Sequence, residues 1–134
     1  MAMQYSVAVR NARLDAIETT VSTAPLLQIR SGGQPANCAA ASTGTLLVEL
    51  TLPSNWMADA ASGAKALAGT WSGVAIDNGT AAHWRIFDSG GSTCHLQGSV
   101  TVSGGGGDMI ASAVVLAISD TFDVTSFTLT GGNA

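Results

Sequence analysis

The fold class is decided by residues 71–102, which read WSGVAIDNGTAAHWRIFDSGGSTCHLQGSVTV. Apolar and polar residues alternate here with the period of two that half-buried strands show. The pair Asn78-Gly79 favours a two-residue type I′ hairpin turn, because both central residues of that turn need a positive φ. The triplet Ser89-Gly90-Gly91 favours a three-residue hairpin loop with a left-handed glycine. We therefore expect three consecutive antiparallel strands.

The two turns also predict which residues face each other. The first turn places Gly73 opposite Trp84, and the second places Ile86 opposite Cys94. Because strand side chains alternate between the two faces of a sheet, one face is expected to belong to the core, with Gly73 leaving room for the indole of Trp84. Its members are Trp71, Gly73, Ala75, Trp84, Ile86, Cys94, Leu96, Gly98, Val100 and Val102.

The opposite face of these strands is mixed. It collects Ser72, Val74, Ile76, His83, Arg85, Phe87, Thr93, His95, Gln97, Ser99 and Thr101. Apolar side chains such as Val74, Ile76 and Phe87 gain nothing from facing water. Either a helix or loop of this chain covers them, or another protein does.

The flanking segments complete the expected architecture. Residues 6–21 show helical spacing, with Ser6 as a candidate N-cap and an end before Pro25. The helix is either a packing helix or an arm that docks on a neighbouring subunit. Its apolar stripe is Val7, Leu14, Ile17 and Val21, and Arg10, Arg13, Asp15 and Glu18 are expected on its solvent-facing side.

Residues 26–30, 46–52, 109–118 and 121–130 are predicted strands, residues 104–107 a flexible loop, and residues 54–63 a loop. The apolar run 109–118 is typical of a central strand that is buried on both sides. Short strands separated by frequent turns indicate an antiparallel β-sandwich or jelly roll with one N-terminal helix. We expect one domain, with an N-terminal arm and helix over residues 1–24 and a β-sandwich over residues 25–134.

Composition excludes several classes of function. Only 10% of the 134 residues are charged, where a soluble domain has about 25%. Ala, Gly, Ser and Thr make up about half of the chain and must build much of its surface. With one Lys, four Arg and a net charge of -4, nucleic-acid binding is not expected. No apolar run is long enough for a membrane span, and no secretion signal is visible.

The side chains that carry chemistry in enzymes are few. His83 and His95 share a face with Arg85, and a guanidinium beside them disfavours a metal site, so surface hydrogen bonding is expected. Cys38 and Cys94 lack any zinc-ligand spacing; free thiols are expected, and a disulfide is the alternative. No catalytic constellation, cofactor site or metal site is predicted, and the chain is not expected to be an enzyme.

The aspartates and tryptophans leave one alternative open. Most of the aspartates fall at turns and strand ends, where Asp caps the backbone. They are Asp59, Asp77, Asp88, Asp108, Asp120 and Asp123. Of the three tryptophans, only Trp56 is not assigned to the core, so it alone is free to contact a sugar. A glycan-binding β-sandwich module is therefore a second function to consider.

Several segments carry a resemblance to a known family. They are residues 10–19 (RNARLDAIET), 37–41 (NCAAA), 52–57 (LPSNWM), 83–88 (HWRIFD), 94–98 (CHLQG) and 124–134 (VTSFTLTGGNA). Together they resemble small virion proteins encoded by tailed bacteriophages and prophages, over nearly the whole chain. The resemblance implies a structural protein that is made in the host cytoplasm and built into the virion.

These observations lead to an expected function. Capsid decoration, or cement, proteins are small β-rich domains that bind between capsomers, often as dimers or trimers. We expect a decoration protein that bridges major capsid subunits and forms a homo-oligomer, with a tail or connector component as the alternative. The residues expected at the interface are Gln4, Tyr5, Arg10, Arg13, Val74, Ile76, Arg85, Phe87 and His95.

Overall fold

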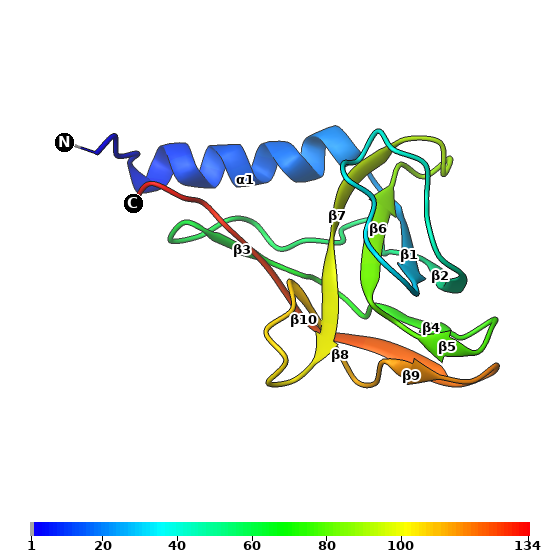
Figure 1. The fold of residues 1–134 in the computed structure, drawn as a ribbon. Helices are drawn as coiled ribbons and strands as arrows, with labels where there is room; N and C mark the ends of the chain where they lie inside the picture. Colours follow the sequence, from blue (N-terminus) through cyan, green and yellow to red (C-terminus); the bar gives the residue numbers. More distant parts are fainter. Residues whose placement is uncertain (1) are drawn as a thin grey trace.

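The computed structural model describes residues 2–134, which form a mainly β structure with a helix at the N-terminal end (Figure 1). In chain order the elements are α1 (Val7–Val21), β1 (Leu26–Arg30), β2 (Leu46–Thr51), β3 (Ala64–Ala66), β4 (Ser72–Val74), β5 (Gly79–Thr80), β6 (His83–Phe87), β7 (Cys94–Val102), β8 (Met109–Ala111), β9 (Val115–Leu116) and β10 (Thr121–Thr130). This confirms the predicted fold class. The jelly-roll connectivity stays a prediction.

The helix begins and ends as the sequence predicts. The Ser6 hydroxyl accepts a hydrogen bond from the Val9 N–H at 3.2 Å, which caps the first turn. Leu14 and Val21 are buried, whereas Val7 is 48% exposed because this part of the helix extends beyond the sheet (Figure 1). Within residues 2–134, no helix is long and apolar enough to cross a membrane.

An ion pair that the sequence does not indicate ties α1 to β3. Lys65 is 1% exposed, and its Nζ donates to Asp15 Oδ1 at 2.7 Å and to the Ala58 carbonyl at 2.8 Å. The hydrogen bond from Lys65 also lowers the pKa of Asp15. The Asp15 side chain nevertheless stays 46% exposed, so it lies at the border between the solvent-facing side of the helix and β3.

Eight strands in the described part of the chain form one sheet, which curls until its ends meet. The order is β2-β1-β6-β7-β8-β10-β3, and β4 pairs with the other end of β10. β4 lies against β2, and Gly73 packs so closely on Val48 that a Cβ atom added to the glycine would lie 3.0 Å from Val48 Cγ1. The Ile76 N–H donates to the Leu47 carbonyl at 2.8 Å. Because β7 and β8 run parallel, the sheet is mixed rather than wholly antiparallel.

Aromatic side chains fill the space that the curled sheet encloses. Trp56 and Trp71 are buried, with their ring centroids 6.0 Å apart. Trp71 lies 5.4 Å from Phe127, which meets Trp84 edge-on at 5.1 Å. Each indole N–H donates to a backbone carbonyl, so the three tryptophans are buried without an unpaired donor.

The predicted hairpin at Asn78-Gly79 is wrong. β4 pairs with β10, and β1 occupies the edge of β6 on which β4 was expected. Asn78 does not have a positive φ, so the turn lacks the type I′ geometry. Its Oδ1 instead accepts a hydrogen bond from the Ile118 N–H at 3.0 Å. Pairing between strands that are distant in sequence has outweighed the local turn signal.

The second predicted hairpin is confirmed, with Gly91 left-handed at a φ of 73°. Its register differs by two residues, because Ile86 faces Leu96 instead of Cys94. A bulge next to Phe87 places Cys94 opposite Phe87. Residues that are directly opposite share a face, so Cys94 leaves the predicted core face.

The glycine that makes room for Trp84 is Gly98 rather than Gly73. The two residues face each other across β6 and β7. A Cβ on Gly98 would lie 2.8 Å from Trp84 Cζ2 and 2.7 Å from Asp108 Oδ2. Gly73 packs against β2 instead. The prediction that a glycine makes room for the indole of Trp84 is therefore confirmed, but the glycine lies on β7 instead of β4.

The predicted central strand over residues 109–118 is also wrong. β8 pairs with β7 and β10, but the chain then leaves the sheet, and β9 forms a separate two-stranded ribbon with β5. Val115 is 75% exposed and Ile118 57% exposed. Val102, which was expected in the core, is 42% exposed. The apolar run therefore contributes to the surface as well as to the core.

Candidate functional site

The mixed face of β6 is covered by residues 31–45, here called the cover loop, which connect β1 to β2 (Figure 1). Arg85 is 1% exposed beneath this loop. Its guanidinium donates to Ser42 Oγ at 2.8 Å and to the carbonyls of Cys38 and Ala40 at 2.9 and 3.0 Å. Phe87, on the same face, is 8% exposed. Of the two alternatives for this face, a loop of the chain itself covers Arg85, and the Arg85 guanidinium lies 5.4 Å from the centre of the Phe87 ring, so neither residue is exposed as the expected interface requires.

His83 is buried rather than hydrogen-bonded at the surface. Its Nδ1 lies 2.9 Å from the Gly32 carbonyl, and since a carbonyl only accepts, Nδ1 carries the proton. Its Nε2 is buried and has no hydrogen-bond partner within residues 2–134. Burial lowers the pKa of His83, and the charges of Arg30 and Arg85 lower it further. A neutral His83 is therefore part of the protein's interior at neutral pH.

Cys38 in the cover loop and Cys94 at the start of β7 are both half-buried and are free thiols, as expected. Burial raises the pKa of Cys94 to about 11, and the neighbouring Cys38 raises it as well. Because the thiolate is the nucleophilic form, Cys94 is a poor nucleophile at neutral pH. The neighbouring Arg85 acts in the opposite direction on the pKa of Cys94, but burial prevails, and the pair lacks the exposure of a catalytic cysteine.

Four of the expected interface residues lie in the first half of α1 or just before it, and the two chain termini meet at this end of the helix (Figure 1). The Tyr5 N–H donates to the Asn133 carbonyl at 2.6 Å, and Gln4 donates to the last carbonyl of the chain at 3.3 Å. The guanidinium of Arg13 lies 4.9 Å from the centre of the Tyr5 ring. Arg10 is half-buried, and its guanidinium packs so closely on Gly63 that a Cβ atom added to this glycine would overlap Nη1. Gln4, Tyr5 and Arg13 thus stand together, whereas Arg10 packs on its own chain.

Val74 and Ile76 lie at the other end of the molecule and are 54% and 58% exposed. The pairing of β5 with β9 and the hydrogen bond from the Ser119 N–H to the Ala75 carbonyl bring residues 115–119 beside them. Val115 and Ile118 add two more exposed apolar side chains there. We call Val74, Ile76, Val115 and Ile118 the corner patch. The sequence identified its first two members and assigned the other two to a buried strand.

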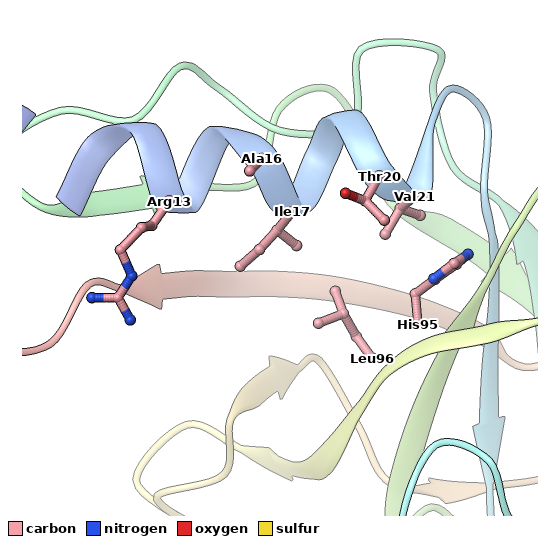
Figure 2. Close-up of a pocket in the computed structure, with 7 residues that line it drawn as sticks. All are labelled: Arg13, Ala16, Ile17, Thr20, Val21, His95 and Leu96. Atoms are coloured by element: carbon pink, nitrogen blue, oxygen red, sulfur yellow. The ribbon is translucent and has the colours of Figure 1, made fainter. Parts of the chain in front are cut away.

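A wedge-shaped notch opens between α1, β7 and β10. β7 and β10 flank β8 and diverge beyond its end, and α1 crosses the open side (Figure 1). Figure 2 shows Ile17 and Arg13 pointing from α1 toward the notch, with Leu96 and His95 pointing up from β7. A hollow of about 250 Å³ lies at this corner, and one of about 520 Å³ lies between Leu96 and Thr130, toward β8. His95, an expected interface residue, lines this notch and is not near the corner patch.

The remaining polar candidates have structural roles. Asp88 accepts from the N–H groups of Ser92 and Thr93, which lowers its pKa, and Asp120 accepts from Ala117. No group of three His, Cys, Asp or Glu side chains that could hold a metal ion occurs in residues 2–134. Trp56, the only tryptophan expected to be free for a sugar, is fully buried. The glycan alternative thus loses the residue on which it rested.

The chain was compared with protein-family models, curated proteins and solved structures, and none of the three comparisons finds a match.

Proposed function

We propose that the protein is a non-enzymatic virion structural protein, a decoration or cement subunit that bridges major capsid subunits of a tailed phage. The corner patch is the observation that supports this proposal best. Its four apolar side chains are each more than half exposed and together present roughly 400 Å². Patches of this size on soluble domains often mark protein interfaces. A subunit that is packed against neighbours would bury them.

The surface chemistry supports the same proposal. The chain has only 14 charged side chains, and two of them, Lys65 and Arg85, are buried in contacts within the subunit. A surface with few charges has a small free-energy cost of desolvation when it is buried against a partner. Many weak contacts in a fixed array also reinforce one another through avidity. The buried Arg85 and Lys65 contacts stiffen the subunit, so little order has to be gained on binding.

The experiment uses heads from particles in which the gene for this chain is deleted. Purified chain is added back, and release of packaged DNA on heating is measured. The wild-type chain is expected to raise the release temperature, and Ile76→Asp is expected to abolish the effect, because a carboxylate cannot be buried in an apolar interface.

Ser103→Asp is the matched control, since it adds the same charge at an exposed loop position. It should behave like the wild type. If neither the wild-type chain nor the control binds to the heads, the capsid proposal is wrong. Equal activity of Ile76→Asp would remove the corner patch from the interface.

A further inference from the structure

The notch contains the open edges of two strands. Both β7 and β10 pair with β8, but β8 is only three residues long. On β7 the pairing with β8 covers Val100–Val102, and on β10 it reaches Phe127. The preceding part of β7 and the last three residues of β10 therefore border the notch without a neighbouring strand.

The register of β6 and β7 identifies the open backbone groups on β7. The Val100 N–H donates to the Ala82 carbonyl, so even-numbered residues of β7 point their N–H and C=O groups toward β6. Gln97 therefore points both groups into the notch. Ser99 does the same, but its N–H is taken by Asp108 and its carbonyl by the indole of Trp84. In residues 2–134 the backbone of Gln97 has no partner on that side.

The same reasoning applies to β10. The Phe127 carbonyl accepts from the Leu67 N–H, and the Gly131 N–H donates to the Gly63 carbonyl, so odd-numbered residues face β3. Thr128 and Thr130 therefore point their N–H and C=O groups into the notch. No partner for these groups occurs in the described residues.

The dimensions and chemistry of the notch fit one extended strand. At β8 its two walls are separated by two strand spacings, about 10 Å, which leaves room for one strand beyond the end of β8. Leu96 and Ile17 supply apolar walls. Arg13 is exposed, and no carboxylate among residues 2–134 forms a salt bridge with it. An acidic side chain of an incoming segment would meet this guanidinium, which lies over the Tyr5 ring but has no carboxylate partner within the described part of the chain.

We propose that the notch accepts an extended polypeptide segment from a neighbouring subunit, which adds a strand along Thr128 and Thr130 of β10, with Gln97 of β7 facing it across the notch at the level of Thr130. Strand addition of this kind obtains affinity from main-chain hydrogen bonds and specificity from alternate side chains. The segment would carry apolar side chains toward Leu96 and Ile17 and an acidic residue beside Arg13. This inference deepens the proposed function and rests on it for the origin of the segment.

The first measurement is amide hydrogen exchange of the full chain by NMR. The N–H groups of Gln97, Thr128 and Thr130 should exchange much faster than those of their neighbours Leu96, Gly98 and Leu129, which are bonded within the sheet. Equal protection of the two sets would overturn the proposal, because the edges would then not be open.

The second measurement is a titration with the acetylated, amidated peptide Thr-Val-Thr-Val-Thr-Glu. The amide signals of Gln97, Thr128 and Thr130 should shift saturably in the millimolar range and become protected from exchange. The same peptide with N-methylated valines lacks the N–H groups on one edge of the extended strand. It cannot donate main-chain hydrogen bonds along that edge and should not bind. Absence of shifts up to the solubility limit, or equal binding of the methylated peptide, would overturn strand addition.

Thr130→Pro tests the main-chain contact in the protein itself. Proline removes the open N–H but spares the bonds to β3, which come from Leu129 and Gly131, and proline is tolerated where the N–H faces solvent. Peptide binding should weaken about fivefold, the effect of one hydrogen bond. Thr130→Ala keeps the N–H and should bind like the wild type.

Equal binding of the proline and alanine variants, with unchanged circular dichroism, would contradict strand addition at this edge. These tests use the isolated chain and a peptide. Their failure would therefore leave the head-binding experiment unaffected, and failure of the latter would leave the strand-acceptor property of the notch intact.

Discussion

Replacing Arg85 by Met should release the cover loop. The guanidinium makes three hydrogen bonds of 3.0 Å or less to this loop, and a hydrogen bond to a charged group contributes about 1.5–3 kcal/mol. Part of this cost is offset, because Met needs no desolvation of a charge. We expect a net loss of about 3 kcal/mol in the free energy of unfolding, which corresponds to a decrease of roughly 10 °C in Tm.

Urea unfolding and the reactivity of the cysteines measure the two parts of this prediction. Cys38 belongs to the cover loop and Cys94 lies beneath it, so both should react faster with a thiol reagent in Arg85→Met. Arg30→Met is the control: Arg30 reaches the same loop with longer bonds of 3.4 Å and is only half-buried. It should change stability by less than about 1 kcal/mol. A similarly small change for Arg85→Met, with unaltered thiol reactivity, would refute the role of Arg85.

Three further predictions concern packing and titration. Gly98→Ala should lower the free energy of unfolding by about 1–3 kcal/mol, because its Cβ overlaps Trp84 and Asp108, whereas Gly33→Ala, with open space, should be neutral in the same urea experiment. The alkylation rate of Cys94, followed by mass spectrometry, should keep rising up to about pH 11; a plateau near pH 9 would show an unperturbed thiol. The free energy of unfolding should fall as the pH drops below about 6.5. The unfolded chain then binds a proton at His83, whereas the lowered pKa keeps His83 neutral in the folded chain. His83→Gln should reduce this slope, and an equal slope would assign it to other groups.

The local elements could be predicted from the sequence because their signals are local. Ser6 and the spacing of Leu14 and Val21 determine the helix, and the glycines at 90 and 91 determine the β6–β7 hairpin. The partner strands could not be predicted in the same way. The free energy that the Asn78-Gly79 turn would contribute is smaller than that of the pairing of β4 with β10. The sequence around the turn does not show this pairing, because β10 lies about 40 residues further along the chain.

The candidate sites divide similarly. Exposure of Val74 and Ile76 follows from their place on the mixed face. The cover loop hides Arg85, however, and no pattern in residues 31–45 indicates which strand the loop will cover. Val115 and Ile118 lie in a run whose hydrophobicity is typical of a buried strand. The open edges at Gln97, Thr128 and Thr130 arise because β8 is shorter than both of its neighbours, which depends on the register of the whole sheet.

The copy number of the chain in purified virions tests the proposed function most directly. Quantitative mass spectrometry of intact particles gives the ratio of this chain to the major capsid protein. A decoration protein is expected at a ratio near one or a simple fraction of it. A number of copies per particle equal to three, six or a small multiple of these would instead assign the chain to the tail or connector, and absence from the particle would contradict a structural role in the virion.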